Sequence, residues 1–169
     1  LPYFQIAGLD LNHYRFNDDP YGDLIVPNAK IPWQEYGLRA DFKTSYYGSV
    51  ESPGGSVLYA LSCVEDGYQG TEVGVDTLYI VALEDYNNEF LRNDTLNNII
   101  QVNDYFAGST FYSLGEYLSD NRESIMLESL TIKLTEGPAK DTALSFALIY
   151  VLSSGEEFQQ QSSVVNLRQ

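Results

Sequence analysis

Hydrophobic and polar residues alternate with a period of two along most of the chain. In the segment 37–47, Leu38 and Phe42 fall on one phase, and Arg39 and Asp41 fall on the other. Side chains on a strand point alternately to opposite faces, so this pattern predicts a strand with one buried and one solvated face. The sequence therefore indicates a half-buried antiparallel sheet in this part of the chain.

Two further segments, 76–84 and 143–152, are apolar on both phases and rich in β-branched and aromatic residues. Their composition favours central strands buried on two faces, although periodicity alone does not separate a buried strand from a buried helix. Between them, segment 128–136 alternates cleanly and predicts a half-buried strand. The sequence LSSGEEF predicts the turn of a terminal hairpin, and the Pro/Gly turn ESPGGS, followed by the strand-like segment 57–65, predicts an earlier one.

Two local features interrupt the strand pattern. The apolar phase shifts by one residue at Ala7 and Gly8, which predicts a β-bulge because a bulge adds one residue and glycine tolerates its backbone angle. Ser113 and Glu116 have the spacing of a capping box, in which each side chain bonds to the other residue's backbone amide. This spacing predicts a short helix near residues 113–119.

These elements together predict an all-β fold. A chain of 169 residues is close to the usual size of one domain and buries roughly 70% of its unfolded surface. We expect a single β-sandwich domain over residues 1–169, with roughly seven to nine strands in two antiparallel sheets joined by Greek-key, immunoglobulin-like connections. A closed barrel is the alternative.

The charge balance excludes two classes of partner. The chain has 24 acidic and 9 basic residues, a formal net charge of −15, and its Lys and Arg residues are scattered singly. Nucleic acids and anionic lipid surfaces are both bound through grouped basic residues, so we expect neither. No apolar run approaches the roughly 20 residues that span a bilayer.

The usual catalytic patterns are missing from the sequence. His13 is the only histidine and lies in a strand-like segment, where we expect an ordinary exposed or edge-strand residue, and Cys63 is the only cysteine. One histidine and one cysteine do not make a tetrahedral zinc site, and the sequence has no nucleophile-elbow or phosphate-loop motif. Neighbouring acids such as Glu84 and Asp85 leave glycoside hydrolysis as one remaining catalytic option.

Oxygen-bearing side chains are dense in the stretch EDYNNEFLRNDTLNN, which begins at Glu84, and in NDDPYGD, which begins at Asn17. Alternate oxygen ligands are typical of calcium loops, but Phe90 stands where an EF-hand needs glycine, so only an irregular calcium site fits. Calcium is the one cofactor considered, and a solvated acidic loop is the alternative. The candidate ligands are Asp85, Asn87 and Glu89 in the first stretch and Asp18, Asp19 and Asp23 in the second.

The chain contains 14 tyrosines and one tryptophan, several of them next to predicted turns. Exposed aromatic rings stack on sugars or anchor protein partners, although aromatic residues are also good strand formers. The ligand-binding candidates are Trp33, Tyr21, Tyr68, Tyr86 and Tyr105.

The order of segments from residue 61 onward, about two thirds of the chain, resembles an uncharacterised family of small secreted or lipid-anchored cell-envelope proteins of gut anaerobic Gram-negative bacteria. The similar elements are LSCVEDGYQG, a strand that runs into the DYN turn, the LNN step, SLGEYL, and the closing strand, turn and strand. The resemblance implies an exported protein in the periplasm or at the outer membrane, anchored by a lipid on a cysteine upstream of Leu1, and it implies no activity. Exported proteins of such bacteria carry O-glycans at Asp-Thr-apolar triplets, which makes Thr95 a candidate glycosylation site.

Three functions fit these observations. The first is a non-catalytic envelope module that binds a protein partner or serves as an assembly component. The second is a glycan-binding module, with calcium fixing the acidic loop. The third is a small hydrolase with paired carboxylates. An exposed row of aromatic rings favours the second function, and an apolar patch rimmed by polar residues favours the first.

Overall fold

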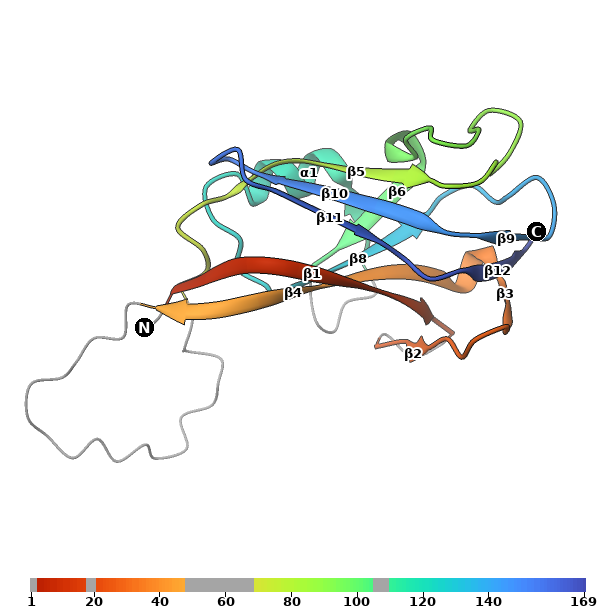
Figure 1. Ribbon diagram of the computed structural model, residues 1–169, viewed down its shortest axis with the longest axis horizontal. Coiled ribbons are helices and arrows are strands. Elements are labelled where there is room, and N and C mark those ends of the chain that lie inside the picture. The colour runs from red at the N-terminus through yellow and green to blue at the C-terminus, as the bar shows by residue number, and fades with distance from the viewer. Residues whose placement is uncertain (1–2, 18–20, 48–68, 105–109) are drawn as a thin grey trace, which may run out of the picture.

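The computed structural model describes residues 3–17, 21–47, 69–104 and 110–169. Antiparallel sheets pack face to face as a sandwich around one apolar core, and the described strands form no closed barrel (Figure 1). The predicted all-β sandwich is therefore confirmed. The predicted hairpin strand 57–65, which contains Cys63, lies outside the described residues.

The first layer is a six-stranded sheet in the order β2-β1-β4-β8-β6-β7, with every neighbouring pair antiparallel. Its register shifts between Ile6 and Gly8, which confirms the predicted bulge. The outward residues Arg39 and Asp41 are less buried than their neighbours Leu38 and Ala40, as the alternation predicts. The strands are β1 (Tyr3–Arg15), β2 (Asp23–Leu24), β4 (Tyr36–Tyr47), β8 (Ser129–Leu134), β6 (Ile100–Asn103) and β7 (Tyr112–Ser113).

The second layer is a three-stranded sheet in the order β11-β10-β5, formed by β5 (Val75–Ala82), β10 (Phe146–Leu152) and β11 (Glu157–Gln161). β10 is central, as predicted. The prediction of two buried faces is wrong for β5, which is the last strand of its sheet and exposes Asp76 and Tyr79. An antiparallel sheet commonly packs one face on the core and leaves the other face solvated, so apolar residues on the outer face of β5 do not indicate a second packed layer.

A third sheet closes one end of the sandwich in the order β3-β12-β9. The central strand β12 (Val165–Arg168) pairs antiparallel with β9 (Thr142–Leu144) and parallel with β3 (Lys30–Pro32). Short 3-10 helices, η1 (Trp33–Glu35) and η3 (Asn97–Ile99), precede β4 and β6. The chain thus leaves the second layer after β11 and enters the third sheet in β12 (Figure 1).

Aromatic pairs join the two main layers. The ring of Phe42 on β4 lies 5.1 Å from that of Tyr150 on β10, and Tyr36 stacks on Phe146 at 6.0 Å. Each ring in these pairs is buried. Such pairs add about 0.5 to 1.5 kcal/mol beyond their area burial, so they fix how the layers pack.

The helix α1 (Leu114–Asp120) confirms the predicted capping box. The amide of Glu116 donates to Ser113 Oγ at 3.2 Å, and the amide of Ser113 donates to Glu116 Oε2 at 2.8 Å. The Ser113 hydroxyl, which donates to Glu116 Oε2 at 2.7 Å, and the Ser113 amide together lower the pKa of the Glu116 carboxyl, because both bonds favour its charged form. Tyr117 is the buried residue of the helix, and it anchors α1 to the core.

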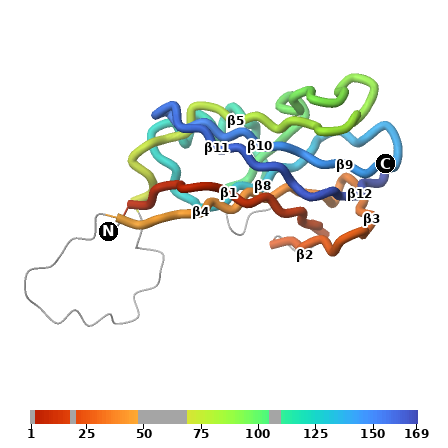
Figure 2. The backbone as a smooth tube through the Cα atoms, viewed as in Figure 1, coloured from red at the N-terminus to blue at the C-terminus, as the bar shows by residue number. Residues whose placement is uncertain are grey.

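The predicted terminal turn joins β10 to β11. The amide of Leu152 donates to the carbonyl of Glu156 at 2.8 Å, and Gly155 has φ +87, which favours glycine. β11 then runs along the same side of the sandwich as β1 (Figure 2). This side of the molecule carries the candidate site.

Candidate functional site

The oxygen-rich stretch EDYNNEFLRNDTLNN is a connection held by its own hydrogen bonds. Asp85 Oδ1 accepts from the amide of Arg92 at 2.8 Å. Asn87 Oδ1 accepts from the amides of Glu89 and Phe90 at 2.9 and 2.8 Å. Asx turns of this kind use the side-chain oxygen to close the backbone. These side-chain oxygens therefore close a turn of the backbone. Two of the proposed calcium ligands, Asp85 and Asn87, already accept hydrogen bonds from backbone amides there.

The end of this stretch covers the free edge of β5. The amide of Asn93 donates to the carbonyl of Ala82 at 2.7 Å, and the amide of Ala82 donates to the carbonyl of Asp94 at 3.0 Å. The amide of Leu96 donates to the carbonyl of Ile80 at 2.7 Å. Residues 93–97 thus pair with β5 as a short added strand would. Within this segment, Thr95 is the residue that forms an antiparallel β-bridge, with Val81 of β5.

Asn97 completes this cover with its side chain. Its Oδ1 accepts from the amide of Ile80 at 3.0 Å, and its Nδ2 donates to the carbonyl of Leu78 at 2.8 Å. One carboxamide therefore satisfies a backbone donor and a backbone acceptor, as a neighbouring strand would.

The second acidic stretch adds no metal site to the described structure. Asp18 and Asp19 lie outside the described residues, and Asp23 is exposed on β2. In residues 3–17, 21–47, 69–104 and 110–169, no group of three His, Cys, Asp or Glu side chains is placed to hold a metal ion.

The predicted aromatic ligands occupy separate environments. Tyr86 is 1% exposed and its hydroxyl donates to the carbonyl of Glu136 at 2.5 Å, and burial raises its pKa. This core position corrects the expectation of an exposed ring. Trp33 is half-buried in η1, and Tyr21 is 55% exposed. Tyr68 and Tyr105 lie outside the described residues.

His13 is buried on β1, so of the two predicted placements, exposed or edge-strand, the exposed one is wrong. Its Nε2 lies 2.8 Å from the carbonyl of Ser163, and its Nδ1 lies 2.9 Å from the hydroxyl of Tyr36. A carbonyl only accepts, so the neutral ring carries its proton on Nε2 and accepts from Tyr36. Burial lowers the pKa of His13, against the opposing effect of the Ser163 carbonyl. The ring joins β1 to the segment that follows β11.

The neighbouring acids have structural contacts in the described region. Glu84 accepts from the amide of Ser145 at 2.6 Å and from its hydroxyl at 3.0 and 3.1 Å. Glu156 is exposed in the turn before β11, and Glu157 is exposed as the first residue of β11. Glu84 therefore ties the end of β5 to the junction between β9 and β10.

A groove of about 330 Å³ lies between the beginning of β1 and the turn that joins β10 to β11. This volume falls at the lower end of the range for ligand sites. Apolar side chains, polar groups and two glutamates line it, and the lining includes no basic residue. The lining residues are Phe4, Gln5, Ile6, Tyr47, Thr71, Glu72, Val73, Leu152, Ser154 and Glu156.

An exposed tyrosine forms one wall of this groove. Tyr47 is 40% exposed, and its ring stacks on Tyr3 at 6.1 Å. Its hydroxyl donates to Glu72 Oε2 at 2.9 Å. Both contacts fix the ring beside a carboxylate, so an aromatic face and a hydrogen-bond acceptor lie next to each other at the groove.

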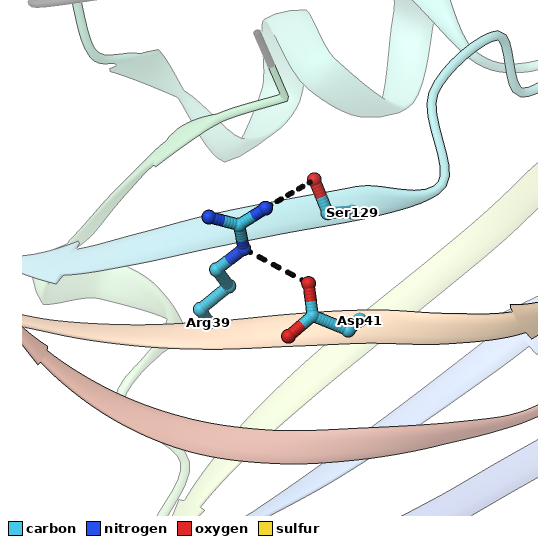
Figure 3. Close-up of polar contacts among 3 residues, drawn as sticks. All are labelled: Arg39, Asp41 and Ser129. Carbon is cyan, nitrogen blue, oxygen red and sulfur yellow. Dashed lines mark hydrogen bonds and ion pairs between the residues drawn. The ribbon is translucent and has the colours of Figure 1, made fainter. Parts of the chain in front are cut away.

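A second group of polar side chains lies on the outer face of the six-stranded sheet. Arg39 Nε donates to Asp41 Oδ1 at 2.9 Å, and its Nη2 makes a long 3.5 Å contact with Ser129 Oγ (Figure 3). Arg39 and Asp41 are two residues apart on β4, so both point to this face. The guanidinium also lies 5.5 Å from the ring centre of Tyr14.

Lys133 lies on the same face between two aromatic rings, 5.0 Å from Phe16 and 4.8 Å from Phe111. Burial lowers its pKa. Phe16 packs closely over Gly37, where a Cβ would come within 2.4 Å of the ring. Cations already occupy these ring faces, so the groove is the better candidate for an external ligand.

The sequence suggests little about this groove. Tyr47 has the same phase as Arg39 and Asp41 in segment 37–47, so the alternation predicts that its ring points to the solvated face, where it can contact a partner. Glu72, Glu156 and Gln5 belong to no sequence motif, because the fold brings them together from three distant segments.

No family model matches the chain, and no curated protein or solved structure is detectably similar to it.

Proposed function

We propose that this chain is a non-catalytic module of the bacterial cell envelope that binds an extended partner in the groove between β1 and the β10–β11 turn. The groove carries this proposal, because its apolar floor lies beside exposed polar groups and an exposed tyrosine. A rim of this kind around apolar surface is typical of interaction sites.

A binding role is favoured over a catalytic one by the state of the only histidine. His13 is held between the Tyr36 hydroxyl and the Ser163 carbonyl. A general base has to reach the proton that it removes, and both ring nitrogens of His13 are engaged in the fold.

The proposed location is extracytoplasmic, in the periplasm or at the outer membrane, with a lipid on a cysteine upstream of Leu1. Its support is the resemblance of the chain from residue 61 onward to exported envelope proteins. Among the described residues, no helix is long and apolar enough to cross a bilayer. Fractionation of the source bacterium tests this part. The protein should be recovered with membranes and released by detergent, and recovery with cytosolic markers would contradict it.

Amide NMR spectra test the binding role. Soluble peptides and oligosaccharides are titrated into the protein, and the shifted amides are mapped. Shifts that gather at Gln5, Tyr47, Glu72 and Glu156 support the proposal. If neither class of probe shifts these amides, the groove is not a binding site. Arg122, in a separate hollow on the α1 side, serves as a control position.

A glycan is the second candidate ligand, favoured by the stacked pair of Tyr47 and Tyr3 beside Glu72. Sugar rings stack on aromatic faces, while carboxylates accept from sugar hydroxyls. The variant Tyr47→Ala should then lose about tenfold or more in oligosaccharide affinity. Tyr79→Ala, an equally exposed tyrosine on β5, is the matched control and should bind as the parent does.

A further inference from the structure

The groove between β1 and the β10–β11 turn carries negative charge without a balancing cation. Two carboxylates, those of Glu72 and Glu156, belong to its described lining, and no Lys, Arg or His side chain does. Both glutamates are exposed, and the ion pairs among the described residues involve neither of them. The chain as a whole has a formal net charge of −15, which adds to the attraction of a cation. The groove therefore favours a positively charged ligand.

Tyr47 holds one of these carboxylates beside an aromatic ring. Its hydroxyl donates to Glu72 Oε2 at 2.9 Å, and its ring stacks on Tyr3 with 6.1 Å between the ring centroids. A carboxylate has about four acceptor positions on its two oxygens, so this single bond leaves Glu72 able to accept from a ligand. A tyrosine ring also attracts a cation placed over its face. Two groups that bind cations thus lie together at the groove.

The floor of the groove is apolar. Phe4, Ile6 and Leu152 are buried and belong to its lining. A ligand that matches both the floor and the rim has an aliphatic stem and a cationic head, as lysine and arginine side chains do. Of these two, arginine is the better match, because its planar guanidinium stacks on aromatic rings and donates to a carboxylate through two N–H groups at once.

We propose that the partner of this module is a protein that inserts an arginine side chain into this groove, with its stem on the apolar floor and its guanidinium at the carboxylates of Glu72 and Glu156. This inference rests on the proposed binding role and names the chemistry of the partner. Charge complementarity selects arginine over a neutral glycan, which makes no use of the two negative charges. A second copy of this chain is disfavoured, because two molecules of net charge −15 repel each other.

The probe is a short peptide with blocked ends that carries one arginine between valine and glycine residues. One control peptide has citrulline in place of arginine, which keeps the shape and removes the charge, and another has lysine. N-acetylarginine amide, which carries the side chain alone, is the third control. Each compound is titrated at constant ionic strength, and its dissociation constant is taken from the NMR shifts of the Gln5, Glu72 and Glu156 amides. The arginine peptide should bind at least about tenfold more tightly than the citrulline peptide, and more tightly than the other two compounds.

Matched variants separate a direct contact from general attraction to an acidic protein. Glu156→Gln and Glu157→Gln each remove one negative charge, but of these two neighbours only Glu156 lines the groove. Glu72→Gln removes the charge and keeps an oxygen that accepts from the Tyr47 hydroxyl. Affinity for the arginine peptide should fall by about threefold or more in Glu72→Gln and in Glu156→Gln, and stay near the parent value in Glu157→Gln. A thermal melt of each variant without peptide confirms that it is folded.

Four results would overturn the inference. Equal binding of the citrulline peptide would show that charge is not recognised, and equal binding of the lysine peptide would remove the preference for arginine. Equal weakening by Glu156→Gln and Glu157→Gln would mean general attraction, and equal binding of N-acetylarginine amide would assign the groove to a small guanidinium compound in place of a protein.

Absence of arginine-peptide binding also overturns the inference. If oligosaccharides or peptides without arginine still shift the amides of Tyr47 and Glu72 in that case, the arginine inference fails and the proposed binding role stands. If no probe shifts them, both fail.

Discussion

The two edges of the three-stranded sheet differ in whether other residues hydrogen-bond to their backbone groups. The β5 edge is covered by residues 93–97, which satisfy its outward amides and carbonyls through backbone bonds and the carboxamide of Asn97. The β11 edge, in contrast, leaves its outward amides at Glu157 and Gln159 without a described partner. The backbone groups of β5 are therefore paired with residues 93–97, whereas β11 lies beside β1 and its outward amides at Glu157 and Gln159 make no hydrogen bond to that strand.

The contrast between these edges should be largest in hydrogen exchange. The amides of Ile80, Ala82 and Leu96 are bonded, whereas those of Glu157 and Gln159 point outward. We expect the first group to exchange at least about a hundredfold more slowly than the second, because exchange of a bonded amide requires local opening. NMR-detected exchange of the protein alone measures this. Similar rates at both edges would remove the contrast.

Removing the side chain of Asn97 should uncover the β5 edge. Asn97→Ala leaves the amide of Ile80 and the carbonyl of Leu78 without their partner. Two half-buried groups that lose their bonds cost about 2 to 4 kcal/mol, which lowers the midpoint by roughly 5 to 15 °C. Thermal unfolding of the variant measures the loss.

Asn97→Asp is the graded control for this substitution. It keeps the oxygen that accepts from Ile80 and loses the donor to Leu78, so its midpoint should fall between those of the parent and Asn97→Ala. An unchanged midpoint in Asn97→Ala would mean that the carboxamide does not stabilise this edge.

His13 should make the end of the β11 edge sensitive to pH. Burial lowers its pKa from the ordinary 6.5, so the unfolded chain takes up a proton before the folded ring does. The contribution of the neutral ring to stability is therefore complete above 6.5 and is lost as the pH falls below it. The melting midpoint of the parent should fall, relative to His13→Gln, over this range.

The comparison with His13→Gln is needed because many carboxylates also titrate on the acid side. At neutral pH the variant itself should be about 1 to 3 kcal/mol less stable, since the glutamine side chain replaces the ring whose two nitrogens bond the Tyr36 hydroxyl and the Ser163 carbonyl. If the midpoints of the parent and the variant change in parallel with pH, the neutral ring is not what anchors Ser163 to β1.

Calcium should have the smallest effect. Asp85 and Asn87 already accept backbone amides, and no three acidic side chains of the described residues converge on a metal position. The melting midpoint of the EDTA-dialysed protein should shift by less than about 1 °C with millimolar calcium. A larger shift would turn this connection into a metal loop and favour the calcium-assisted glycan module.

The sequence correctly predicted two features that depend on residues close together in the chain. Ser113 and Glu116 make the predicted capping box, and the phase shift at Gly8 is the predicted bulge. Both depend on residues close in the chain, whose backbone geometry limits the outcome. Thr95 is exposed, as a glycosylation site requires, and its modification stays a prediction.

The sequence did not predict the burial of residues that contact distant segments of the chain. The sequence placed His13 as an exposed or edge-strand residue and Tyr86 at a turn, and both are buried, because Tyr36, Ser163 and Glu136 approach them from other segments. Nothing in the alternation of 76–84 indicates that its outer edge is covered by residues 93–97. Each of these placements is a long-range contact.

The sequence by itself determined the all-β class, the buried faces of β4 and β8, the terminal turn and the cap of the helix, since these follow from a side-chain period and from neighbouring residues. Tertiary structure alone decided which strands became edges, which edge was covered, and which residues met in the groove. The physical reason is that a strand shows the same period whether its backbone groups are paired with a neighbour or left open.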